Sequence, residues 1–129
     1  MTYYIDGYTK ESNPSTEGGY TITDKDGKII LQSILKSLDG SKTITNNYTE
    51  FVGLCEAIKL AEPNSTIYTD SMNNLSWIDG GFPKKSKRKD LIPLAFEHHH
   101  IYKSKNITLS WCPREDNLAG HINEEMFSA

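Results

Sequence analysis

Cysteine is scarce in this chain, and the sequence lacks the long apolar runs of membrane proteins and the signal peptide of secreted proteins. The 129 residues include two cysteines, Cys55 and Cys112, which form no CxxC pair. We therefore expect buried free thiols in a reducing compartment and no disulfide. No apolar run is long enough to span a bilayer, and the N-terminus lacks the basic region and apolar stretch of a signal peptide. These absences predict a cytoplasmic protein without a membrane partner.

Positive charge is also not in excess. The chain has 14 Lys and Arg residues against 17 Asp and Glu residues, so its formal net charge is −3. This balance weighs against a protein that coats nucleic acid by bulk attraction. A compact acidic centre can still bind a polyanion once divalent ions reverse its local charge. A nucleic-acid substrate is therefore compatible with the composition, provided that binding is local.

The pattern of residues predicts one domain over residues 1–129, without repeats or linkers. β-Branched runs, turn signals and helical spacing of apolar residues predict five strands and four helices. Three strands come first, and helices and strands then follow one another, which implies a mixed sheet flanked by helices. The predicted strands are residues 3–9, 20–23, 28–36, 66–69 and 106–111, and the predicted helices are residues 48–61, 71–78, 90–103 and 117–127.

Three acidic residues lie at positions where these elements would direct them to a common point. Asp6 lies within the first strand beside Gly7, Glu50 lies near the start of the first helix, and Asp70 ends the fourth strand. A buried lone aspartate is costly unless it binds a cation or a base. The alternative for Glu50 is a capping carboxylate, with Asn46 or Asn47 as the N-cap, and Asp70 could also be a cap. Together the three carboxylates favour a site for hard divalent cations in an enzyme that acts on phosphodiesters.

Five stretches in this order resemble the type 1 ribonuclease H family over nearly the whole chain. They are Tyr4–Gly7, Gly18–Tyr20, Thr45–Asn47 followed by Glu50, Tyr68–Ser71, and Trp111–Asn117. The resemblance implies an α/β fold with three antiparallel and then two parallel strands, covered by helices on both faces. It also implies hydrolysis of the RNA strand of RNA–DNA hybrids with two Mg²⁺ or Mn²⁺ ions, which leaves 5′-phosphate and 3′-hydroxyl ends.

The resemblance matches Asp6, Glu50 and Asp70 to three of the four catalytic metal ligands of the family. The fourth, normally an aspartate four residues after Asn117, falls here on His121. A neutral imidazole can bind a divalent metal, although it suits Mn²⁺ better than Mg²⁺. The alternatives are that His121 is a surface residue in a copy that has lost an acid, or that Asp116 helps instead.

The resemblance also implies residues that contact the hybrid. Asn46 and Asn47 match the pair that reads the minor groove, where 2′-hydroxyls are displayed and where amides can both donate and accept. Thr45 matches a hydroxyl that holds a phosphate of the DNA strand, and Arg114 matches a residue near the active site that assists product release. The same matching stretches add Gly7, Ser71 and Asn117 to the expected substrate-binding set.

A basic run follows the second predicted helix. Its residues Lys84, Lys85, Lys87 and Arg88 could contact the backbone of the hybrid, and we expect that contact to be weak. The alternative is a solvated loop, as is common for charge runs.

Two other functions remain open at this stage. The missing fourth acid favours a non-catalytic nucleic-acid-binding domain, whereas a junction resolvase of the same superfamily would act on DNA. Asn46 and Asn47 favour RNA recognition over the resolvase. No protein partner is evident, so we expect a monomer that binds RNA–DNA hybrid.

Overall fold

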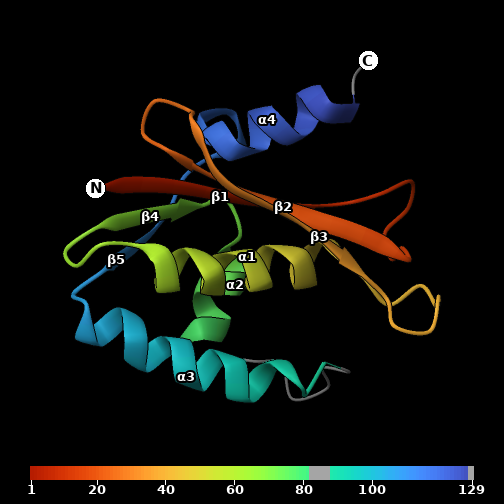
Figure 1. The fold of residues 1–129 in the computed structure, drawn as a ribbon. Helices are drawn as coiled ribbons and strands as arrows, with labels where there is room; N and C mark the ends of the chain where they lie inside the picture. Colours follow the sequence, from red (N-terminus) through yellow and green to blue (C-terminus); the bar gives the residue numbers. More distant parts are fainter. Residues whose placement is uncertain (82–87, 128–129) are drawn as a thin grey trace.

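A five-stranded sheet forms the centre of the computed structural model, which describes residues 1–81 and 88–127 (Figure 1). Its strands lie in the order β3-β2-β1-β4-β5, with β1 antiparallel to β2, β2 antiparallel to β3, and β1, β4 and β5 mutually parallel. This arrangement confirms the predicted mixed sheet. The strands are β1 (Thr2–Thr9), β2 (Glu17–Asp24), β3 (Ile29–Lys36), β4 (Thr66–Thr69) and β5 (Thr108–Trp111).

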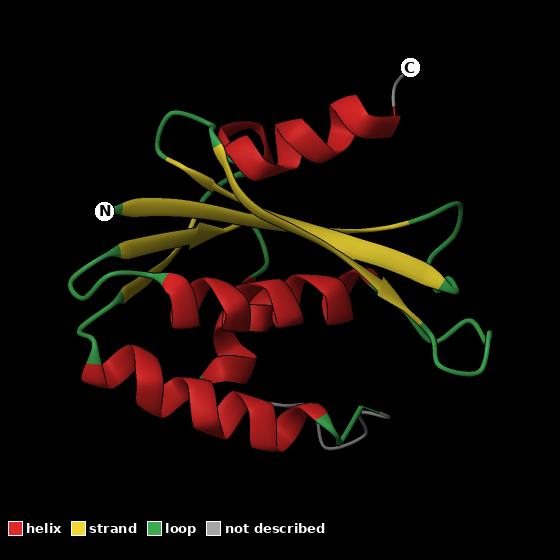
Figure 2. Cartoon of the chain, in the orientation of Figure 1, coloured by secondary structure: helices red, strands yellow, loops and turns green. Residues whose placement is uncertain are grey.

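Helices cover both faces of the sheet, as predicted (Figure 2). Three of them lie on one face, and α4 lies alone on the other. Within the described residues, no helix has the length and apolar content needed to cross a membrane. The helices are α1 (Asn46–Leu60), α2 (Met72–Ile78), α3 (Leu91–Ser104) and α4 (Leu118–Phe127), and a short 3₁₀ helix, η1 (Arg114–Asp116), precedes α4.

Helix α1 packs directly on β1 and β2, and glycines make this close approach possible. A Cβ atom on Gly53 would lie 2.4 Å from Ile5 Cδ1, and one on Gly7 would lie 2.5 Å from the Glu50 backbone nitrogen. Phe51 of α1 is fully buried in the same layer. Since no side chain separates β1 from α1 at Gly7, the backbone of Glu50 is fixed next to the strand that carries Asp6.

The two cysteines are buried and free, as predicted. Burial raises the pKa of the Cys55 thiol to about 12, so this thiol stays protonated at neutral pH. The burial of Cys112 raises the pKa of its thiol as well, and nearby Asp70 adds to the effect. Both residues therefore act as small apolar groups in the core.

The start of α1 differs from the prediction. The helix begins at Asn46, and its N-cap is Thr45, whose hydroxyl accepts the Tyr48 N–H at 3.1 Å. The predicted start at residue 48 was therefore two residues too late. The alternative with Asn46 or Asn47 as the cap is also wrong, because the Thr45 hydroxyl satisfies the free N–H. Glu50 consequently lies beyond the first turn, where a carboxylate has no capping role.

The other predicted cap is confirmed. The Ser71 hydroxyl accepts the Asn74 N–H at 3.2 Å, and α2 runs from the next residue to Ile78. Strand β4 also matches its predicted bounds. At the fifth strand the prediction began too early, because Asn106 has a left-handed backbone with φ of 54° and β5 starts only at Thr108.

Lys105 closes the C-terminal end of α1 from the end of α3. Its ammonium group donates to the carbonyl oxygens of Ile58, Lys59 and Ala61 at 2.9, 2.6 and 3.0 Å. We expect Lys105→Met to lower the free energy of unfolding by about 1–2 kcal/mol, because three carbonyls lose a charged donor. Denaturant unfolding measures this change. The exposed control Lys25→Met should stay within about 0.5 kcal/mol of the wild type, and equal effects of the two substitutions would contradict the capping role.

Candidate metal centre

Three carboxylates converge where β1, α1 and β4 meet. Asp6, Glu50 and Asp70 each offer one oxygen, and these oxygens all lie within 4.8 Å of one another. The structure therefore gathers the three acidic residues that the sequence pattern singled out. Binding of a metal by them remains a prediction.

The electrostatics of this cluster favour a cation. Only 5% of Asp6 is exposed, and its burial raises the pKa of the carboxyl group, even though Asn123 donates to it. The pKa of Glu50 is raised as well, first by burial and then by the negative charges of Asp6 and Asp70. Neutralising these charges would relieve the repulsion. Hard divalent cations prefer carboxylate oxygens of this kind.

Asn117 supports the cluster through hydrogen bonds to β1 and to Asp70. It is fully buried, and its side-chain nitrogen donates to Ile5 O at 3.0 Å and to Asp70 Oδ2 at 3.4 Å. Its side-chain oxygen accepts the backbone N–H groups of Ala119 and Gly120, so the same residue caps α4. Asn117 thus ties α4, β1 and Asp70 together, and its effect on a ligand would pass through Asp70.

Asn123 plays a similar part for Asp6, and sequence reasoning missed it. Its side-chain nitrogen donates to Asp6 Oδ2 at 2.9 Å and to the Asp6 carbonyl oxygen at 3.2 Å, and its oxygen accepts the Thr21 hydroxyl at 2.6 Å. The signal was its place four residues after Ala119, which puts the two residues on one face of α4, and that face is buried. An amide at an inward-facing position of a short helix is a candidate bracing residue.

His121 lies apart from this cluster. It is exposed on α4, and among the described residues the group of converging ligand atoms contains only the three carboxylates. The residues of α4 that face the pocket at Asp6 are instead Gly120, Asn123, Glu124 and Phe127. Sequence reasoning did not single out Glu124.

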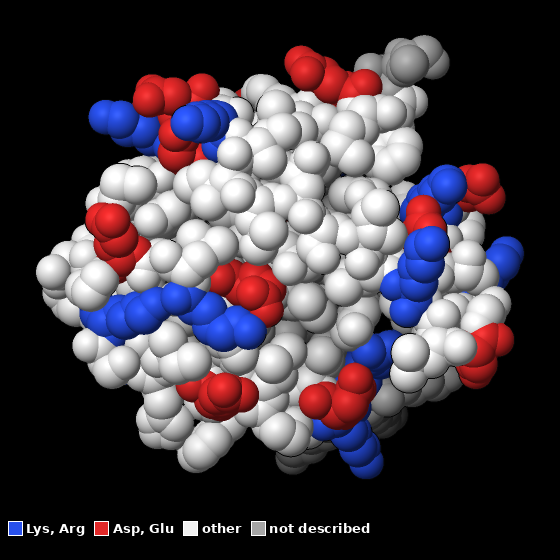
Figure 3. All heavy atoms as spheres, in the orientation of Figure 1, with Lys and Arg blue, Asp and Glu red and all other residues white. Residues whose placement is uncertain are grey.

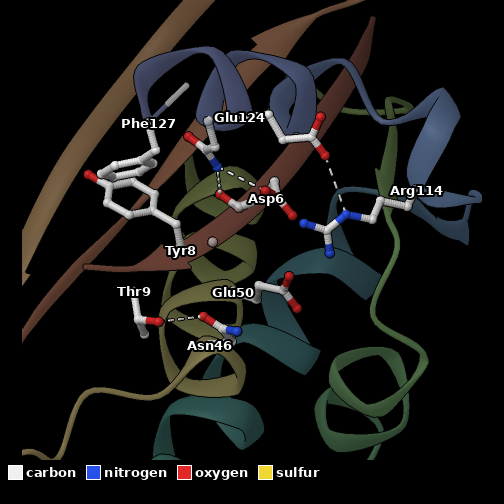
Figure 4. A pocket seen from close by; sticks show the side chains of 11 residues that line it. Asp6, Tyr8, Thr9, Asn46, Glu50, Arg114, Glu124 and Phe127 are labelled. Carbon is white, nitrogen blue, oxygen red and sulfur yellow. Dashed lines mark hydrogen bonds and ion pairs between the residues drawn. The ribbon is translucent and has the colours of Figure 1, made fainter. Parts of the chain in front are cut away.

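Two hollows join at the carboxylates. The first has a volume of about 390 Å³ and lies between β1 and α4 (Figure 4). The second, of about 460 Å³, lies beside the N-terminus of α2. Asn46 and Glu50 line both hollows, so the two adjoin at the cluster, and together we call them the groove. The first is lined by Asp6, Gly7, Glu50, Arg114 and Glu124 among others, and the second by Asn47, Asp70, Ser71, Met72, Asn73 and Trp111.

The expected substrate-binding residues fall into several places. Gly7, Asn46, Asn47, Ser71 and Arg114 line the groove, and the Thr45 hydroxyl caps α1 next to it. The exposed indole of Trp111 also lies there and donates to the Asp70 carbonyl oxygen at 3.2 Å.

The basic run is only partly covered by the structure. Lys84, Lys85 and Lys87 lie outside the described residues. The guanidinium of Arg88 lies 4.0 Å from the centre of the Tyr48 ring, in a separate hollow that Thr43 and Asp90 also line. On the face shown in Figure 3, cationic and anionic side chains are interspersed among the described residues. On this face, the mixed charges give no field of one sign that would attract a polyanion.

Comparisons with known proteins relate the chain to a family model and to solved structures. The family model described as RNase H matches residues 1–125. LC11-RNase H1, isolated from compost and solved in complex with an RNA/DNA hybrid, is 25% identical, with a TM-score of 0.59 over 90% of this chain and 87% of that chain. A search of curated proteins found no match.

Two further structures share the fold. RNase H1 of Halobacterium salinarum is 18% identical, with a TM-score of 0.64 over 99% of this chain and 98% of that chain. The N-terminal RNase H domain of a Mycobacterium tuberculosis protein, solved as a fusion with maltose-binding protein, is 21% identical, with a TM-score of 0.60 over 99% and 97%.

Proposed function

The chain belongs to the RNase H family, and we propose that it is a metal-dependent endoribonuclease. It would hydrolyse the RNA strand of RNA–DNA hybrids and leave 5′-phosphate and 3′-hydroxyl ends. The observation that carries this proposal is the convergence of Asp6, Glu50 and Asp70 within 4.8 Å at the centre of an open groove. Such a group has the charge and the ligand type that a phosphodiester hydrolase with divalent ions requires.

Asp6, Glu50 and Asp70 would hold the two ions, which we propose to be Mg²⁺ or Mn²⁺. The donor set fits them, because all three groups are carboxylates whose repulsion a cation relieves. Divalent ions at such sites activate the attacking water and stabilise the leaving oxygen. Asn123 and Asn117 would keep the oxygens of Asp6 and Asp70 in place by donating hydrogen bonds to them.

The groove supports a hybrid as the substrate. Asn46 and Asn47 present amides beside Glu50, and 2′-hydroxyls in a minor groove can both donate to and accept from amides. The similarity to LC11-RNase H1, which was solved with an RNA/DNA hybrid, supports the same choice. Arg114 projects into the other half of the groove and would meet the phosphates there.

Asn47 is the clearest test of recognition by the groove. We expect Asn47→Ala to raise the KM for hybrid about tenfold with a smaller change in kcat, because the amide binds substrate and touches no reacting atom. Steady-state kinetics on a labelled hybrid measures both constants. Asn73→Ala removes a second amide from the same hollow and is the matched control, with an expected change in KM below about threefold. Equal changes in the two variants would contradict the role of Asn47.

One observation favours a second candidate, a nucleic-acid-binding domain without catalysis. The α4 side chain that contacts the Asp6 carboxylate is the amide of Asn123, at 2.9 Å, and the converging carboxylates of the described residues include none from α4. The experiment that separates the candidates incubates the protein with labelled RNA–DNA hybrid, duplex RNA, duplex DNA and a four-way DNA junction in Mg²⁺ and in Mn²⁺. Cleavage of the RNA strand of the hybrid alone supports the proposal. Binding of the hybrid without cleavage in either ion supports the second candidate, and cleavage of the junction points to a resolvase.

A further inference from the structure

The face of α4 that looks toward Asp6 is formed by residues one turn apart. Gly120, Asn123 and Glu124 share this face, because residues three and four positions apart lie above one another on a helix. His121 follows Gly120 by about 100° of rotation and is exposed. The titratable side chain of α4 that faces the pocket is therefore Glu124 and not His121.

Gly120 leaves room between α4 and the carboxylate cluster. A Cβ atom built there would lie 3.6 Å from both the carboxyl carbon and Oδ2 of Asp6, which is ordinary van der Waals distance. A Cβ atom therefore fits at this position, and Gly120 itself adds no side chain between α4 and Asp6. A longer side chain from one turn further along the helix can turn toward this space.

Glu124 is that side chain. It lines the same pocket as Asp6 and Glu50, and 58% of it is exposed, so its carboxylate is free to change rotamer. Glu124 forms an ion pair with Arg114, whose Nε lies 3.5 Å from Glu124 Oε1. Such an exposed and long contact is weak and easily exchanged.

Arg114 supplies positive charge to this side of the site. Its side chain is 73% exposed, and Figure 4 shows the guanidinium between Glu124 and Glu50. Its charge also acts on Asp6, where it works against the effect of burial. The Arg114 guanidinium thus lies close to the place where a cation would bind.

We propose that Glu124 supplies the fourth carboxylate of the metal centre, directly or through a coordinated water, and that Arg114 holds Glu124 until the ion arrives. The inference rests on the proposed function, since it names a further ligand of the same ions. Ion binding draws Glu124 away from Arg114, and the released guanidinium faces the groove. The acid that the family pattern places four residues after Asn117 is then provided seven residues after it.

Mn²⁺ binding to the metal-free full-length chain tests this inference without reference to catalysis. Isothermal titration calorimetry and the electron paramagnetic resonance signal of free Mn²⁺ both measure the affinity. We expect Glu124→Gln to weaken binding about tenfold. Glu125→Gln removes the same charge from the next position on α4 and should change the affinity less than about twofold, as should His121→Ala. Arg114→Gln should tighten binding about two- to fivefold, because the competing cation is gone.

A second experiment tests whether a carboxylate introduced at Gly120 restores Mn²⁺ binding. Gly120→Asp in the Glu124→Gln background introduces a carboxylate beside Asp6, and we expect it to recover most of the lost affinity. Circular dichroism of each variant checks that it is folded. Wild-type affinity in Glu124→Gln overturns the inference alone, as does a loss in His121→Ala without a loss in Glu124→Gln. A wild-type protein that binds no Mn²⁺ overturns the inference and the proposed function together.

Discussion

Asp70→Asn is expected to reduce the rate of hybrid cleavage by about three orders of magnitude while leaving the protein folded. The substitution keeps the shape of the side chain and removes one of three charges that would hold the ions, and a metal ion contributes several kcal/mol to stabilising a transition state. Asp70 is well suited to this test because it is less buried than Asp6. Single-turnover cleavage of a labelled hybrid in Mg²⁺ measures the loss.

The control substitution removes a carboxylate at an exposed position away from the cluster. Asp26 lies in the exposed turn between β2 and β3, so Asp26→Asn should cleave at the wild-type rate within about twofold. If Asp70→Asn kept more than about a tenth of the wild-type rate in both Mg²⁺ and Mn²⁺, the carboxylate cluster would not be the catalytic centre.

Saturating Mn²⁺ is expected to raise the melting temperature by about 10 °C. The ions bind the folded state, where the three carboxylates are gathered, and not the unfolded chain, where they are scattered. At a concentration 100 times the Kd this linkage contributes about 2.7 kcal/mol. For a domain of this size each kcal/mol shifts the melting temperature by about 3–5 °C. Differential scanning calorimetry with and without a chelator measures the shift.

Asp70→Asn separates specific binding from a general salt effect. Without metal, this variant should melt at or slightly above the wild-type temperature, because one of three clustered negative charges is gone. With Mn²⁺ its melting temperature should rise by less than about a third of the wild-type shift. Equal shifts in the two proteins would show that Mn²⁺ acts at another place.

The fold could be predicted from the sequence because its signals are local. The β-branched run at β4, the Ser71 cap and the apolar spacing of α1 each depend on a few neighbouring residues, and all three agree with the structure. The start of α1 was predicted two residues too late, and local chemistry did not identify its N-cap, because Thr45, Asn46 and Asn47 are all good caps. Only the position at which the backbone turns into the helix decides among them.

The site was predictable only in part, since its remaining members depend on tertiary packing. Asp6, Glu50 and Asp70 stand at ends or centres of predicted elements, and their convergence follows from strand order. Asn117 and Asn123 are buried amides that donate to Asp70 and Asp6 from more than 40 residues away, so their contacts with the cluster depend on tertiary packing. His121 and Glu124 differ by the rotation of α4 about its axis, which counting residues does not supply.

The most direct test of the central claim is the anomalous scattering of Mn²⁺ in crystals grown or soaked with the ion. We predict two peaks about 4 Å apart at the cluster, with oxygens of Asp6, Glu50 and Asp70 as ligands. Peaks elsewhere on the protein, together with an empty cluster at millimolar Mn²⁺, would contradict the account.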